Sequence, residues 1–275
     1  RLGLSFHNTR SMLQKVDSIP ERCGDWKIKQ IRFQDRVSQG VEETFNVYHR
    51  DPIEAVKALW GDPAFADHLV YKPSRMFTNG AKDQKSRIYS EMWTGKWWWA
   101  VQVWINFYKC LATIAPVIIA TDKTHLTNFS GGKSAYPVYL TLGNIPKAMR
   151  RKVNQRACVL LGYLPVDKVN KGSDTDTELK LRNYQLFHDS MRIILEPLIA
   201  AGLEGVEMVG GDGVVRRVHP ILAAYVADYP EQCLVTLSKY GTCPKCQTSA
   251  NDLEDEGPGP PKTHDWTTSK ISEAR

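Results

Sequence analysis

The sequence predicts a mixed α/β (α+β) fold, in which flanking helices cover a mixed sheet, and three observations support this prediction. An apolar run at 114–120, rich in β-branched residues, stops on Asp122 and is too short for most helices. Two further strand-like runs, 136–142 and 156–164, follow after short turns, which is typical of an antiparallel meander. Apolar residues then recur three and four positions apart over 178–201, which predicts one long amphipathic helix.

Length and composition limit the class of protein. The chain has 275 residues, of which 42% are hydrophobic, and this is enough for a sizeable core. A formal net charge of +6 suits an anionic partner without proving one. The most apolar window, 100–120, contains Gln102, Asn106 and Lys109, so no transmembrane helix is predicted. Six cysteines in a chain of this length favour a reducing compartment, the cytosol or the nucleus.

Residues 1–112 are predicted to form a strand and helix region that precedes the core. The runs 25–32 and 44–49 alternate in polarity and are suited to pairing as a hairpin. Asp51 and Asp62 each stand directly before a proline, which is the pattern of a helix N-cap followed by an N1 proline. We therefore expect two short helices here and interpret these aspartates as caps, not as catalytic acids.

The next stretch concentrates aromatic residues: Trp93, Trp97, Trp98, Trp99 and Trp104. Such a cluster can stack against bases, as in proteins that bind single strands. It can equally anchor a core, because tryptophan buries a large apolar surface. Since Trp98 and Trp99 would point to opposite faces of a strand, at least some of these rings must be buried, and the core interpretation is favoured.

Two aspartates follow apolar runs and are the candidate catalytic and metal-binding residues. Asp122 follows a strand placed at 117–121, because Pro116 is tolerated only near a strand start or edge. Asp228 follows the apolar run 221–227. A carboxylate at a strand end can reach solvent while its backbone stays fixed. The alternatives are that Asp122 only begins a turn and that Asp228 only caps the next helix.

Two groups of basic residues are candidates for contacts with nucleic-acid phosphates. Arg150, Arg151 and Lys152 lie in the turn after the second strand-like run, where a solvated loop is the alternative. Arg216 and Arg217 lie in a predicted β-hairpin. An Asp-Gly pair at the tip of that hairpin is a strong turn signal.

A CxxC motif, formed by Cys243 and Cys246, gives residues 241–250 the pattern of a zinc knuckle. Tetrahedral zinc needs two more ligands, and the candidates, His264 and Cys233, are not at compelling spacing. The motif is therefore half of a zinc site. A redox role is less favoured, because Cys243 follows a polar loop and does not open a helix after a strand.

Taken in order, the elements predict a ribonuclease H-like core over residues 113–240. A strand ends on Asp122, two meander strands and a long helix follow, and a further strand region ends on Asp228. The chemistry of this fold needs acidic residues from different strands to hold two divalent ions about 3.5–4 Å apart. Magnesium suits ligand sets made only of oxygen.

Several phrases of the sequence also carry a family resemblance. In chain order they are GDPAFADHLVYKPSR, EMWTGKWWW, APVIIATDKTHLTNFSGGKSAYPVYLTLGNIPK, CVLLGYLPV, HPILAAYVADYPEQCLV and CPKC. They resemble the fungal Plavaka-type transposases of the KDZ group, which is related to CACTA elements, up to about Gln247. The resemblance implies a nuclear DDE/D transposase that cuts and joins DNA with magnesium. Its first acid falls on Asp122 and its second on Asp228, with Asp212 as runner-up.

The third acid of such a triad would lie on a helix well downstream of the CxxC motif. Residues 251–275 are instead predicted to form an acidic, Pro/Gly-rich disordered tail. In such a tail no helix would orient the carboxylates of Glu254 and Asp255. We therefore expect a copy truncated at both ends, with an incomplete catalytic core. The alternatives are a non-catalytic DNA-binding fragment, a domesticated remnant, or a fragment that does not fold alone. DNA is the expected partner, no membrane is expected, and a homo-oligomer is left open.

Overall fold

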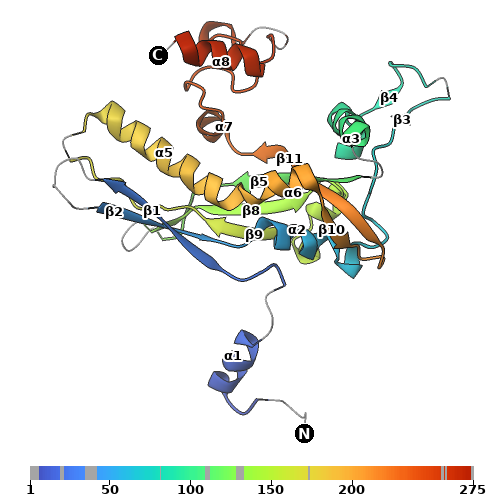
Figure 1. Ribbon diagram of the computed structural model, residues 1–275, viewed down its shortest axis with the longest axis horizontal. Helices are drawn as coiled ribbons and strands as arrows, with labels where there is room; N and C mark the ends of the chain where they lie inside the picture. The colour runs from blue at the N-terminus through green and yellow to red at the C-terminus, as the bar shows by residue number, and fades with distance from the viewer. Residues whose placement is uncertain are drawn as a thin grey trace.

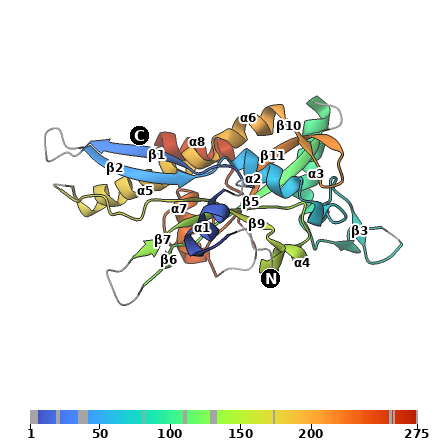
Figure 2. The same ribbon diagram turned by 90° about the horizontal axis from the view of Figure 1, so that it is seen from below.

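The computed structural model describes residues 6–18, 22–34, 42–80, 82–108, 112–127, 133–172, 174–254, 257 and 259–273. Within these residues, seven strands form one mixed sheet in the order β1-β2-β9-β8-β5-β11-β10 (Figures 1 and 2). Its strands are β1 (Lys27–Gln34), β2 (Glu42–His49), β5 (Thr113–Thr121), β8 (Pro137–Leu142), β9 (Cys158–Tyr163), β10 (Val206–Val209) and β11 (Val215–Val226). Two short hairpins stand apart from it: β3 (Met76–Phe77) with β4 (Arg87–Ile88), and β6 (Thr124–His125) with β7 (Ser134–Ala135).

The centre of the sheet has the predicted ribonuclease H-like arrangement. Strand β5 pairs antiparallel with β8, and β8 pairs antiparallel with β9. After the helices α5 (Asp176–Leu195) and α6 (Pro197–Glu204), the chain returns as β11, which runs parallel to β5 on its other side. The predicted mixed α/β fold class is thus confirmed. Its sheet contains three antiparallel strands, and a fourth strand, which follows the helices, runs parallel to the first.

Strand β5 begins earlier than the sequence predicts. The expected start was residue 117, because proline lacks an amide N–H, whereas the strand starts at Thr113. The pairing with β8 begins only at Val117, so Pro116 lies just outside the registered pairs. The Pro116 carbonyl still accepts a hydrogen bond from the Gly143 N–H at 2.7 Å. Pro116 therefore costs the sheet little.

The N-terminal region contains the predicted hairpin but only one of the two predicted helices. Strands β1 and β2 pair antiparallel, and β2 joins the main sheet through β9. Helix α2 (Pro52–Trp60) begins at Asp51, whose side chain accepts a hydrogen bond from the Ile53 N–H at 2.8 Å. Asp62 is also a cap, since its Oδ1 accepts a hydrogen bond from the Ala64 N–H at 2.9 Å, but it opens only the 3₁₀ turn Pro63–Phe65.

The tryptophan-rich stretch forms a helix, α3 (Lys96–Tyr108), and its core role is confirmed. Trp98 is fully buried and, with Ile105 and Ile114, forms a small second core. Trp99 is half-buried, and Trp104 is 54% exposed. A helix can bury both Trp98 and Ile105 because residues seven positions apart share one face of a helix, whereas in a strand they would point to opposite faces.

The main core lies on the sheet face covered by α2, α5 and α6. The single helix predicted over 178–201 is in fact two, because Pro197 has no N–H with which to continue α5. Thr175 and Glu178 form a capping box at the start of α5. Helix α6 ends at Gly205 and not, as predicted, at Gly202.

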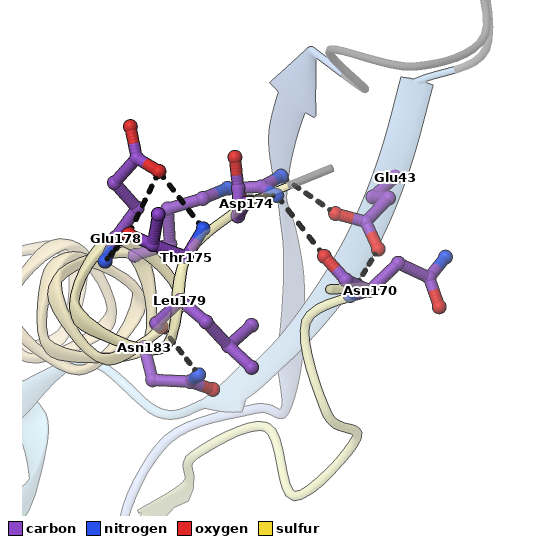
Figure 3. Close-up of polar contacts among 8 residues, drawn as sticks. Glu43, Asn170, Asp174, Thr175, Glu178, Leu179 and Asn183 are labelled. Carbon is purple, nitrogen blue, oxygen red and sulfur yellow. Dashed lines mark hydrogen bonds and ion pairs between the residues drawn. The ribbon is translucent and has the colours of Figure 1, made fainter. Parts of the chain in front are cut away.

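The start of α5 is tied to β2 by a buried ionic cluster (Figure 3). Arg182 donates to Glu43 and to Asp174, each at 2.8 Å, and to the carbonyl of Asn170 at 3.1 Å. The exposed fractions of the Arg182, Glu43 and Asp174 side chains are 15%, 9% and 3%, so the charges face each other and not water.

The remaining helices are α1 (Thr9–Asp17), α4 (Lys147–Arg150), α7 (Tyr229–Val235) and α8 (His264–Glu273). Helix α1 lies away from the sheet on the N-terminal side, whereas α7 and α8 lie beyond the end of β11 (Figure 1). The structure differs here from the expectation of a disordered tail, since α8 occupies part of residues 251–275. The predicted turn at 130–132 and Asp255 lie outside the described residues.

Candidate functional site

The two predicted acids, Asp122 and Asp228, meet at one edge of the sheet. Strands β5 and β11 are parallel neighbours, and their last registered pair is Ala120 with Val226. Asp122 and Asp228 each lie two residues beyond this pair, so both follow the carboxyl-terminal ends of neighbouring parallel strands. Because neighbouring strands lie about 4.8 Å apart, the two carboxylates share the carboxyl-terminal edge of the sheet. Both side chains are exposed.

Their local settings differ. Asp228 caps α7, and its Oδ1 accepts a hydrogen bond from the Glu231 N–H at 3.0 Å. The Asp122 carbonyl accepts a hydrogen bond from the Thr124 hydroxyl at 3.4 Å, as in a turn. In the described part of the chain, the Asp122 carboxylate has no hydrogen-bond or ion-pair partner. The cap interpretation of Asp228 therefore holds, whereas Asp122 lies in the short link between β5 and β6, and both residues are exposed to solvent.

Beside the two aspartates lies a third carboxylate, that of Glu231 in the first turn of α7. Its Oε1 accepts hydrogen bonds from the Thr121 hydroxyl and from the Tyr136 hydroxyl, the latter at 2.7 Å. The Thr121 oxygen is also 2.7 Å from the Tyr225 hydroxyl. Thr121 of β5 and Tyr136, just before β8, thus converge on one oxygen of α7, and Tyr225 of β11 joins the network through Thr121.

Both tyrosines of this network remain protonated donors. Burial, and then the hydrogen bond to Glu231, raise the pKa of Tyr136 well above its ordinary value. Burial also raises the pKa of Tyr225. A hydroxyl that keeps its proton can donate to Thr121 or Glu231 at any physiological pH. The network consequently fixes α7, and with it Asp228, to the end of β5.

Glu231 was not predicted as a residue of the site. The signal that was available is the spacing of Asp228 and Glu231, an acid three residues after a cap, which is the capping-box pattern. That pattern locates a helix start. It does not show that the carboxylate turns away from its own helix to bind side chains of distant strands.

The donor set at this edge fits a magnesium-type ion bound in part by its substrate. Asp122 and Asp228 supply only oxygen ligands, and Mg²⁺ is usually held by one or two carboxylates together with substrate phosphates. Among the described residues, no three His, Cys, Asp or Glu side chains gather as a metal-binding group. Glu231, whose Oε1 already accepts hydrogen bonds from Thr121 and Tyr136, is placed to support the site.

The CxxC motif forms a compact loop after α7. The Lys245 N–H points to Cys243 Sγ at 3.4 Å, and Cys246 Sγ lies 3.0 Å from the Thr248 hydroxyl. The contact with Thr248, followed by the one with Cys243, lowers the pKa of Cys246 to about 7, which favours the thiolate that zinc binds. No third ligand joins these thiols within the described residues, and the buried Cys233 instead points to the carbonyl of Thr242 at 3.9 Å. Zinc stays a prediction.

The five predicted phosphate-binding cations fall into two kinds. Arg150 is held inside the fold by the carbonyl of Ile145 at 3.0 Å and by Glu91 at 3.8 Å. Arg216 is paired with Asp212 through two hydrogen bonds of 2.9 and 2.7 Å. The others keep their charge at the surface: Arg151, Lys152 and Arg217, of which Arg217 donates to the carbonyl of Glu204 at 3.0 Å.

An apolar cavity lies apart from the carboxylates. It has a volume of about 530 Å³ and is lined mainly by apolar side chains of α5, α6 and β11, with Trp104 from α3. Asp122, Asp228 and Glu231 do not line it. The candidate site is therefore an open edge of the sheet, which suits a large substrate better than a small molecule.

The topology and the two acids define a mixed α/β protein with carboxylates after the ends of its two central parallel strands. The comparison with family models then identifies the group: residues 6–275 match the Plavaka transposase family, so the chain belongs to that family. The match extends through residues 248–275, which the sequence resemblance had left outside. The search of the curated proteins found no match. Within the described residues, no helix is long and apolar enough to span a membrane.

Proposed function

We propose that this transposase-derived protein acts on DNA by metal-dependent strand cleavage and transfer, and that Asp122 and Asp228 hold the divalent cation. The observation that carries the proposal is the parallel register of β5 and β11, which brings both acids to one exposed edge. A divalent ion bound there would activate the attacking oxygen and stabilise the leaving oxygen of a phosphodiester.

The residues of the chain position this site. Helix α7 orients Asp228 through its capping hydrogen bond, and Glu231 holds α7 against Thr121, the residue before Asp122. Asp122 keeps its carboxylate free of other described partners and is thereby available to a ligand. The proposal includes an incomplete catalytic core that lacks its third acid, with DNA as partner and the nucleus as the place of action.

A second function, DNA binding without catalysis, is favoured by one observation. Within the described residues, two carboxylates and not three serve as candidate ligands at the edge, whereas Arg151, Lys152 and Arg217 lie at the surface. In that case DNA affinity would depend on salt and not on either aspartate.

Calorimetric titration with Mn²⁺, used as a magnesium surrogate, separates the two functions. We expect the wild type to bind Mn²⁺, and Asp122→Asn and Asp228→Asn each to abolish binding, because each removes one of two charged ligands. Asparagine caps helices as well as aspartate does, so Asp228→Asn should leave α7 intact.

The control is Asp67→Asn, which alters an exposed aspartate near α2 and should bind Mn²⁺ like the wild type. Thermal melting of all four proteins shows whether they are equally folded. If both substitutions at the sheet edge leave Mn²⁺ binding unchanged, the carboxylates do not form a metal site, and DNA binding without catalysis is the function left to test.

A further inference from the structure

A small basic hairpin projects from the molecule at the end opposite to the carboxylates. This basic arm, defined as residues 72–80 and 82–96, contains β3 and β4 and ends at the start of α3. Figures 1 and 2 both show it extending beyond α3, away from the main sheet. Sheet pairing does not explain it, since β3 and β4 pair only with each other.

The arm carries most of the excess positive charge of the protein. It contains six cations, Lys72, Arg75, Lys82, Lys85, Arg87 and Lys96, and two acids, Asp83 and Glu91. Its net charge is thus 6 − 2 = +4, compared with +6 for the whole chain. A local excess of this size raises the potential for an anionic ligand at one place on the surface.

Within the described residues, neither acid forms an ion pair with a cation of the arm. Asp83 accepts a hydrogen bond from the Ser86 N–H at 2.7 Å and so closes the turn before β4. Glu91 faces away from the arm, where it accepts hydrogen bonds from the Lys147 N–H at 3.2 and 3.3 Å and lies 3.8 Å from Arg150. In the part of the chain that the structure describes, Lys82 and Lys96 have no ion-pair partner and are exposed.

The cations surround a pocket of about 240 Å³ whose walls alternate charge and aromatic rings. The lining side chains come from both strands of the arm, the loop between them and the first turn of α3, and four of them are cations against one acid: Arg75, Phe77, Lys82, Asp83, Gln84, Arg87, Tyr89, Lys96 and Trp99. A pocket with this lining attracts an anion and excludes a simple hydrophobic ligand.

The arginines of the pocket are held in place by the rings. The Arg75 guanidinium lies 5.0 Å from the centre of the Trp99 ring. Arg87 lies over Phe77 at 5.4 Å and over Tyr89 at 5.1 Å, and it also donates to two backbone carbonyls. Such contacts fix a guanidinium before a ligand arrives, which lowers the entropic cost of binding.

We propose that the basic arm binds the phosphodiester backbone of duplex DNA, with Lys82 and Lys96 as contacts that face the phosphates. Guanidinium groups already lie over the ring faces, so the rings support the arginines and do not stack on bases. The contact is therefore expected to be independent of sequence. This inference rests on the proposed function in so far as DNA is the partner.

The position of the arm indicates which part of the DNA it would hold. Helix α3 packs its Trp98 against Ile114 at the start of β5, whereas Asp122 follows the end of that strand. The nine residues of β5 span about 30 Å at ~3.3 Å per residue. Since duplex DNA rises about 3.4 Å per base pair, the arm would contact DNA roughly nine base pairs from the carboxylates.

The test is the salt dependence of DNA binding, measured by fluorescence anisotropy with a labelled duplex of arbitrary sequence. The variant Lys82→Ser/Lys96→Ser removes two exposed charges of the arm, and the control Lys29→Ser/Lys168→Ser removes two exposed charges elsewhere. Each lost phosphate contact lowers the slope of log K against log salt by about 0.9, so we expect the slope to fall by about 2 in the arm variant. The control should keep the slope of the wild type.

Equal slopes in the arm variant and the wild type, or an equal fall in the arm variant and the control, would overturn the inference. In either case the protein still binds DNA, and the proposed function stands. A wild type that binds no DNA would overturn both the arm and the DNA partner. Mn²⁺ binding, measured without DNA, reports on the carboxylates independently of all three results.

Discussion

The carboxylate of Asp212 is occupied by hydrogen bonds within the fold. Its oxygens accept two hydrogen bonds from Arg216 and one from the Val214 N–H at 3.1 Å. Arg216 in turn lies over the Tyr71 ring at 3.8 Å. The hydrogen bonds from Arg216 hold the pKa of Asp212 at about 2. A carboxylate already paired with a guanidinium is a poor metal ligand, which favours Asp228 over Asp212 as the second acid.

The lowered pKa makes a prediction about pH. An unfolded aspartate titrates at about 3.9, so the contribution of Asp212 to stability is complete above that pH and is lost as the pH falls towards 2. We expect Asp212→Asn to lower the melting temperature at pH 7, and this difference from the wild type to shrink between about pH 4 and pH 2. Melting followed by circular dichroism measures both. A difference independent of pH would show that the ion pair does not stabilise the fold.

The residues of the candidate site were predictable to different degrees for a physical reason. Asp122 and Asp228 stand out because an apolar run stops at each, and such a boundary is visible in a few neighbouring residues. Glu231 is different, because its partners Thr121 and Tyr136 lie 110 and 95 residues away. A local pattern shows where a helix begins, but contacts of this separation exist only in the folded chain.

At the scale of elements, glycine decides where α6 ends. Gly205 has φ +76° and ψ 151°, a region that only glycine occupies readily. A Cβ atom at this position would lie 2.6 Å from Nε2 of the buried His219. Glycine is therefore needed at position 205 both for its backbone angles and because a side chain would collide with His219. Gly202, the predicted end, lies inside the helix.

We expect Gly205→Ala to lower the free energy of unfolding by roughly 1–3 kcal/mol from backbone strain, plus the cost of displacing His219. The matched control is Gly213→Ala, since Gly213 has φ +77° but open space around its Cβ position. The control should show strain alone, about 1–2 kcal/mol. Denaturation by urea measures both variants. Equal losses would mean that the contact with His219 carries no cost.

Element boundaries, like the site residues, were predictable where the signal is local and not where it depends on distant contacts. The hairpin of β10 and β11 was predictable because the turn residues at its tip are local, and Gly213 indeed adopts positive φ. The start of β5 was not, since whether Pro116 interrupts a sheet depends on which neighbour faces it. The break at Pro197 could have been predicted, because proline interrupts helices. The apolar periodicity continues across it, however, and this periodicity led to the prediction of a single helix.

At the scale of the whole molecule, the ionic cluster around Arg182 joins the N-terminal hairpin to the core. Glu43 lies on β2, Asp174 lies just before α5, and Arg182 lies within α5. Strand β2 also pairs with β9. Both connections cross the boundary between residues 112 and 113 that the sequence predicts for the core, which raises the question of whether the two parts unfold together.

Substitution of Arg182 answers this question. Arg182→Met leaves two buried carboxylates without their cation, and removing one partner of a buried ion pair typically costs about 3–5 kcal/mol. We expect a loss of this size in urea denaturation, with one transition and an unchanged m-value if hairpin and core form one cooperative unit. The variant Arg182→Met/Glu43→Gln/Asp174→Asn, which removes all three charges, should regain much of the loss. Two separate transitions would instead support the predicted boundary, and a loss below about 0.5 kcal/mol would show that the cluster contributes little.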